Sequence, residues 1–260
     1  MFTFYRKNKT YPAGRVGPFT ESHEPRLAST LFVASAQSGY FACDNTGGIT
    51  NCGMDHNDVY GCCGAAMVDH ALVYQAKNTK LIGTLGKPKF NGLLATYFAY
   101  GRSVGEPGPR PDQGVNNSTW LAFLYKNGII DGYAEIPLDQ IDWYCREFLG
   151  VCTGQIINKQ AIPDFNANPR IPWGSPGEVK APNEGHDTLV VKTDGQGGGY
   201  MATWGGLIEF LLDYRGNITD AWVIFDKDDP RVDWTTLQAA LDAIHGVVTP
   251  PPVAKKWRWL

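Results

Sequence analysis

The sequence predicts an α+β fold in which a helical lobe packs on a twisted antiparallel sheet, with a cleft between them. Helix-like patterns fill residues 62–149, whereas apolar strand patterns dominate residues 187–225. Helices followed by strands indicate two layers around one core. A hydrophobic content of 43% and 8 tryptophans are ample for that core in a chain of 260 residues.

Apolar spacing predicts the helices. Small and apolar side chains recur with a helical period over residues 62–78. A second clear pattern covers residues 119–127, with Ser118 as its N-cap and Gly128 as its end. Further helices are expected over residues 92–101, 136–149, 208–214 and 233–244.

Short apolar runs predict the strands of the sheet. The glycine-rich residues 195–199 lack the Lys-Ser/Thr ending and the following helix of a phosphate loop, so we interpret them as a hairpin turn. Proline and glycine in residues 164–182 predict a loop. The predicted strands cover residues 154–157, 187–193, 200–204 and 222–225.

Charge and composition exclude several functions. The net charge of −3 does not provide the concentrated positive field that binding of nucleic acid needs. No apolar run is long enough to span a membrane, and the N-terminus lacks the pattern of a secretory signal peptide. No Cys-x-x-Cys pair is present, so neither a metal nor another cofactor is expected.

The six cysteines allow two short-range disulfides, Cys43–Cys52 and Cys145–Cys152. Without a secretory signal, free thiols are the default for most of the six. The remaining pair, Cys62 and Cys63, opens the first predicted helix.

Cys63 is the expected thiol nucleophile. A cysteine at a helix N-terminus lies close to backbone N–H groups and to the positive end of the helix dipole, which favour the thiolate. His186 precedes an apolar strand and is the candidate base, while Asn57 and the Cys63 backbone N–H would hold an oxyanion. The alternative is that Cys63 is a buried structural cysteine.

These residues resemble the papain-like cysteine peptidases, and in particular a phage and bacterial branch with a Gly-Asn-Asp-x-x-Gly-Asp-Cys motif. At that motif this chain has His56-Asn57-Asp58-Val59-Tyr60-Gly61-Cys62-Cys63. Cys63 takes the nucleophile position, and His186 matches the histidine of the family. The resemblance implies a papain-like fold with Cys63, His186 and Asn57 as catalytic residues.

One member of the family's catalytic set is missing. The family's Asn-Ser-Trp-Gly turn is matched by Ala202-Thr203-Trp204-Gly205, which puts Ala202 where the family has asparagine. An orienting group normally fixes the tautomer and rotamer of the imidazole. Thr203, Asp187 or a backbone carbonyl would have to replace that group, and Trp204 would shield the histidine.

The resemblance also divides the chain. Residues 51–246 are expected to form the papain-like domain, with a helical part over 51–153 and a sheet part over 154–246. Residues 1–50 would form an N-terminal arm and loops. Residues 247–260 would form a Pro-rich tail that is basic and aromatic.

The function implied by the resemblance is a cysteine-dependent amide hydrolase acting on protein or on a peptide cross-link of the cell wall. The alternative is a non-catalytic phage protein, associated with the tail or the capsid, that contacts other virion proteins through its arm or tail. A transferase with the same acyl-thioester chemistry is a third interpretation. Without a signal peptide, we expect synthesis in the host cytoplasm, with association with the virion left open.

Overall fold

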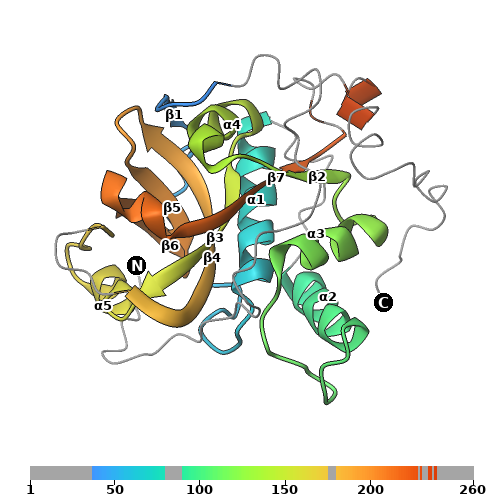
Figure 1. The fold of residues 1–260 in the computed structure, drawn as a ribbon. Coiled ribbons are helices and arrows are strands. Elements are labelled where there is room, and N and C mark those ends of the chain that lie inside the picture. Colours follow the sequence, from blue (N-terminus) through green and yellow to red (C-terminus); the bar gives the residue numbers. More distant parts are fainter. Residues whose placement is uncertain are drawn as a thin grey trace.

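The computed structural model describes residues 37–79, 90–174, 180–227, 229, 234, 235, 237 and 238. Within these residues, seven strands form one antiparallel sheet with the order β2-β7-β3-β4-β5-β6, and β1 pairs with β4. Figure 1 shows the sheet as a curved, twisted layer with helices on both of its faces.

Strand β4 runs through the centre of the sheet and organises it. It pairs with β3 along one edge and with β5 along the other, and its last three residues pair with β1. The strands are β1 (Ala42–Asp44), β2 (Gly132–Glu135), β3 (Val151–Asn158), β4 (Lys180–Asp194), β5 (Gly199–Thr203), β6 (Gly206–Phe210) and β7 (Ile218–Phe225).

The longest helix, α1, packs against the middle of the sheet, with α2 and α3 beyond it (Figure 1). The shorter helices α4 and α5 lie on the opposite side of the sheet. The helical segments are α1 (Cys63–Thr79), α2 (Phe90–Ser103), α3 (Asn117–Lys126), the 3-10 turn η3 (Leu138–Gln140), α4 (Ile141–Phe148), α5 (Ala161–Asn166) and the 3-10 turn η4 (Leu212–Asn217).

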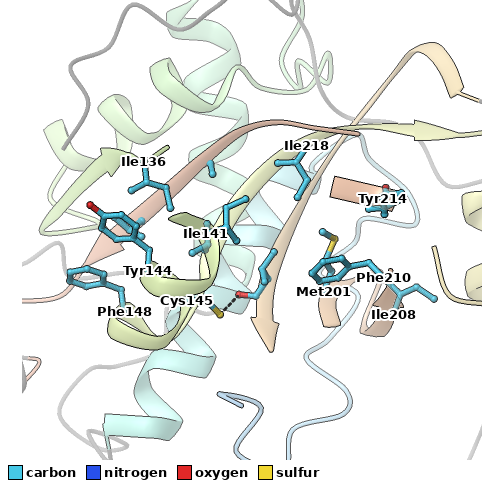
Figure 2. Close-up of a cluster of buried hydrophobic side chains, with 14 of the residues drawn as sticks. Ile136, Ile141, Tyr144, Cys145, Phe148, Met201, Ile208, Phe210, Tyr214 and Ile218 are labelled. Atoms are coloured by element: carbon cyan, nitrogen blue, oxygen red, sulfur yellow. Dashed lines mark hydrogen bonds between the residues drawn. The ribbon is translucent and has the colours of Figure 1, made fainter. Parts of the chain in front are cut away.

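The sheet separates two apolar cores because neighbouring residues of a strand point to opposite faces. On β4, Leu189 and Val191 pack with α1, α2 and α3, whereas Val190 packs with α4 on the other face. Figure 2 shows part of this second core, where Tyr144 and Phe148 of α4 lie near the strands. Successive side chains of β4 therefore enter the two cores alternately.

Most predicted elements are present, and the hairpin turn over 195–199 is confirmed as the connection between β4 and β5. The predicted helix over 208–214 is wrong in its first half. Ile208 and Phe210 are buried while the residues between and before them are half-buried, which is the period of a strand, so the first half of this segment belongs to β6. The second half is helical, because the 3-10 turn η4 begins at Leu212. The N-cap of α3 is Asn116 rather than Ser118, because the Asn116 carboxamide accepts from Thr119 N.

Three further predictions differ from the structure. The segment over 136–149 begins as a separate 3-10 turn after Pro137, and only Ile141–Phe148 is α-helical. Part of the loop predicted over residues 164–182 forms α5 and the start of β4. The N-terminal arm expected over residues 1–50 includes β1, which is part of the sheet. Most of the helix expected over 233–244, and all of the tail, lie outside the described residues.

Candidate functional site

Cys63 is the first residue of α1, as the sequence predicts. The carbonyl of Cys62 accepts from the backbone N–H groups of Ala65 and Ala66, both at 3.0 Å, which fixes the first turn. Glycine is strongly favoured at the next position, since a Cβ at Gly64 would lie 2.3 Å from a methyl carbon of Val115. The thiol is therefore held at a helix N-terminus, but in a tightly packed interior.

The partner of the Cys63 thiol is a carboxylate. Its Sγ lies 3.3 Å from Oδ2 of Asp187, and the side chain is fully buried. Burial, followed by the negative charge of Asp187, raises the pKa of Cys63 well above its ordinary value. The structure thus holds Cys63 as a neutral thiol that donates to Asp187, which is the opposite of an activated nucleophile.

A buried polar network extends from this pair. The side-chain amide of Asn117 donates to Oδ1 of Asp187 at 2.9 Å and to Oδ1 of Asp220 at 3.0 Å. The indole of Trp222 donates to the same Asp220 oxygen at 2.7 Å. Asn117 comes from α3 and Asp220 from β7, so the network joins the helical layer to the sheet and fixes the position of the Asp187 carboxylate.

His186 lies on the opposite face of the sheet from Cys63. Pairing with β3 is regular over this stretch, so side chains of β4 alternate between the two faces. His186 therefore points to the same face as Val190, and Asp187 points to the same face as Leu189. The His186 ring is fully buried, its Nε2 is 2.6 Å from the Thr203 hydroxyl, and it stacks on Trp204 at 4.5 Å between centroids. Burial lowers the pKa of His186 to about 3, so the ring is neutral.

The predicted set of site residues is therefore divided between two faces. Thr203 and Trp204 both contact His186, so these three predicted residues lie together. Asp187, which was expected beside the imidazole, contacts the thiol instead. Among the described residues no hydrogen bond joins Cys63 to His186.

The positions of Ala202 and Asn57 complete the comparison with the predicted site. Ala202 packs in the core under α1, on the thiol side of the sheet. Asn57 is buried, and within the described part of the chain its Oδ1 has no hydrogen-bond partner. This oxygen is an acceptor, whereas an oxyanion needs a donor, so the oxyanion role of the Asn57 NH₂ group stays a prediction.

A second buried cluster surrounds His70, which lies on α1 about two turns after Cys63. Its Nε2 lies 3.1 Å from Oδ2 of Asp55 and 3.0 Å from the carbonyl oxygen of Gly53. Burial opposes the imidazolium, but hydrogen bonds with Asp55 and Cys52 outweigh burial and raise the pKa of His70 to about 10. Because Gly53 also pairs with Gly205, this cluster fastens α1 to the turn that carries Trp204.

The sequence gives no sign of the ionic partner of His70. Asp55 precedes α1 in a turn with positive φ, and no spacing rule connects such a turn to a helix residue. In the described ranges no group of three or more metal-binding side chains is present. None of the helices described there is long and apolar enough to cross a membrane.

Comparisons with known proteins identify the fold. No protein-family model and no curated protein matches the chain. Among solved structures, the chain is similar to xylellain, a cysteine protease from Xylella fastidiosa, with a TM-score of 0.57 and 13% sequence identity. The match covers 85% of this chain and 98% of xylellain. The predicted α+β, papain-like fold is thereby confirmed, whereas the phage branch has no support from these comparisons.

Proposed function

We propose that this protein uses a papain-like fold without thiol-peptidase turnover and acts as a binding or structural protein. The observation that carries the proposal is the contact of the Cys63 thiol with the Asp187 carboxylate, while His186 lies on the other face of the sheet. A papain-like nucleophile needs an imidazole within hydrogen-bond reach, and a carboxylate in that place opposes the thiolate.

The electrostatic cost of a thiolate at this position is large. Two unit charges 3.3 Å apart repel by about 5 kcal/mol at an effective dielectric constant of about 20. The positive end of the α1 dipole compensates only part of this, since such effects reach at most about 2 kcal/mol. At neutral pH the Cys63 side chain is then a thiol, without a base to deprotonate it.

The partner class follows from the sequence rather than from the described structure. We propose that the protein belongs to a phage particle, as a tail- or capsid-associated component. The N-terminal arm and the basic, aromatic tail over 247–260 would contact other virion proteins, because tryptophan and arginine are typical interface anchors. A globular domain flanked by segments of this composition suits assembly better than turnover.

A cysteine-dependent hydrolase of proteins or cell-wall peptides is the second candidate. It is favoured by the fold and by the position of Cys63 at the N-terminus of α1, with Asn57 six residues earlier. For this chemistry His186 would have to replace Asp187 on the α1 face. A shift of β4 by one residue would exchange the two faces, at the cost of its pairing with β3 and β5.

A peptidyl electrophile of the epoxide class separates the two candidates. The full chain is treated with the reagent, and the labelled cysteine is mapped in the wild type and in Cys63→Ser and His186→Ala variants. The binding protein is expected to show no labelling of Cys63 and no hydrolysis of casein or of cell-wall peptides. Labelling of Cys63 that disappears in His186→Ala would establish the hydrolase instead.

A further inference from the structure

Two cysteines far apart in the sequence meet at the C-terminal end of β4. Sγ of Cys43, on β1, lies 3.4 Å from Sγ of Cys145, on α4. The short-range disulfides allowed by the sequence are not the pairs that the fold brings together. Cys145 and Cys152 belong to the cores on opposite faces of the sheet, and Cys52 interacts with His70.

Polar groups surround both sulfurs of the pair. The Thr193 hydroxyl lies 3.2 Å from Cys43 Sγ, and the Asn45 side-chain amide is 3.8 Å from Cys43 Sγ and 3.6 Å from Cys145 Sγ. The same amide donates to the Cys145 carbonyl at 2.7 Å, which ties β1 to α4. The Cys145 thiol also lies 3.5 Å from the carbonyl oxygen of Val190 (Figure 2, dashed line).

The two sulfurs differ in exposure and in acidity. Cys43 is half-buried, whereas Cys145 is fully buried. The hydrogen bond with Cys145 outweighs burial and lowers the pKa of Cys43 to about 7, against a small opposing effect of Asp142. The pKa of Cys145 is raised well above its ordinary value, first by its hydrogen bond with Cys43 and then by burial. Cys43 is thus the nucleophile and Cys145 the thiol that keeps its proton.

We propose that Cys43 and Cys145 form a thiol–disulfide exchange site for small disulfides such as oxidised glutathione. The Cys43 thiolate attacks one sulfur of the disulfide, whose S–S bond breaks and releases one thiolate, which takes a proton from water. This leaves a mixed disulfide on Cys43. Cys145 then attacks Sγ of Cys43, the mixed-disulfide bond breaks, and the departing second thiolate takes the Cys145 proton. In total, one small disulfide is reduced to two thiols and the protein gains one disulfide.

The geometry suits the second step, because Cys43 and Cys145 are placed better for a disulfide than the other cysteine pairs considered above. A disulfide requires a sulfur separation of about 2.05 Å, so the pair has to close by about 1.4 Å. The bond would join residues 102 positions apart and would fix β1 to α4. Cross-links that close long loops stabilise proteins, so oxidation should raise Tm by about 5–10 °C.

The test is oxidation of the full chain with oxidised glutathione, followed by mass mapping of non-reduced peptides. The expected product is the Cys43–Cys145 disulfide, formed before any other adduct. Cys145→Ser should accumulate the glutathione adduct on Cys43, Cys43→Ser should leave Cys145 unmodified, and Cys152→Ser should behave like the wild type. Cross-linking of Cys43 to Cys52, or adducts spread over all six cysteines, would overturn the proposal.

Because Cys145 is packed in a core, its serine variant is supplemented by a measurement on the wild type. The glutathione adduct on Cys43 should appear first and decay as the disulfide accumulates, and the oxidised chain should melt at the higher temperature. A disulfide that forms without raising Tm would contradict the linkage of β1 to α4. This outcome is independent of whether Cys63 is catalytic.

Discussion

Replacing Asp187 by asparagine should make Cys63 more reactive, which is the reverse of what removing a catalytic partner would do. Asparagine has nearly the same shape, so its carbonyl oxygen can still accept from Asn117. Its NH₂ group would then face the Cys63 sulfur and donate to a thiolate. The substitution therefore removes a negative charge 3.3 Å from the sulfur and introduces a donor there.

The size of the effect follows from the electrostatic repulsion. About 5 kcal/mol at an effective dielectric constant of about 20 corresponds to a pKa difference of between 3 and 4, as an upper bound. A decrease of one in the pKa of Cys63 is enough to increase its thiolate fraction about tenfold at pH 8. We therefore expect Asp187→Asn to accelerate alkylation of Cys63 by iodoacetamide at least about tenfold.

The assay has to separate acidity from access, because Cys63 is buried and a less stable variant opens more often. Cys62 is an internal control, since it is fully buried beside Cys63 and Asp187 is not among the charges that raise its pKa, so its labelling reports opening. The expected result is a higher ratio of Cys63 to Cys62 labelling in Asp187→Asn, and no change in the exposed control Asp139→Asn. An unchanged or lower ratio in Asp187→Asn would refute the reasoning.

Stability should respond to pH and to packing near the site. The pKa of His186 is lowered to about 3, so its contribution is complete above about pH 6.5 and is lost as the pH falls toward 3. The pKa of His70 is raised to about 10, so its contribution is complete below about pH 6.5 and is lost as the pH rises toward 10. Denaturant titrations should therefore find the greatest free energy of unfolding near pH 6.5, and His70→Gln should flatten the alkaline side; an unchanged alkaline side would contradict the buried imidazolium. Gly64→Ala should lower the free energy of unfolding by about 1–3 kcal/mol, because its Cβ has no room, whereas Gly216→Ala should change it by less than about 0.5 kcal/mol. Equal effects of the two glycine variants in urea unfolding would contradict the packing at the start of α1. Thr203→Val should cost about 1–3 kcal/mol in the same assay, because it leaves a buried ring nitrogen of His186 unpaired, and a neutral outcome would count against that hydrogen bond.

The sequence predicted the position of Cys63 well because its signals are local. A small-residue helix that begins after a glycine-containing turn is recognisable from neighbouring residues, and α1 begins at Cys63 as expected. The fold class was also predictable, since helical and strand patterns separate along the chain. The family resemblance added the fold that the comparison with xylellain confirms.

The pairing of Cys63 with Asp187 was not predictable, because it depends on the parity of one strand. His186 and Asp187 are adjacent, and either can face α1 until the register with β3 and β5 is known. The Asn117 amide that fixes Asp187 comes from α3, 70 residues away, and the sequence pattern does not connect them. The contact between Cys43 and Cys145 likewise depends on long-range pairing of β1.

The most direct test of the central claim is the ultraviolet absorbance of the Cys63 thiolate as a function of pH, taken as the difference between the wild type and Cys63→Ser. A thiol that donates to a buried carboxylate should show no thiolate absorbance between about pH 5 and pH 9. A thiolate signal that is already present near pH 6 and is lost in His186→Ala would contradict the account, because it would require the imidazole to face Cys63.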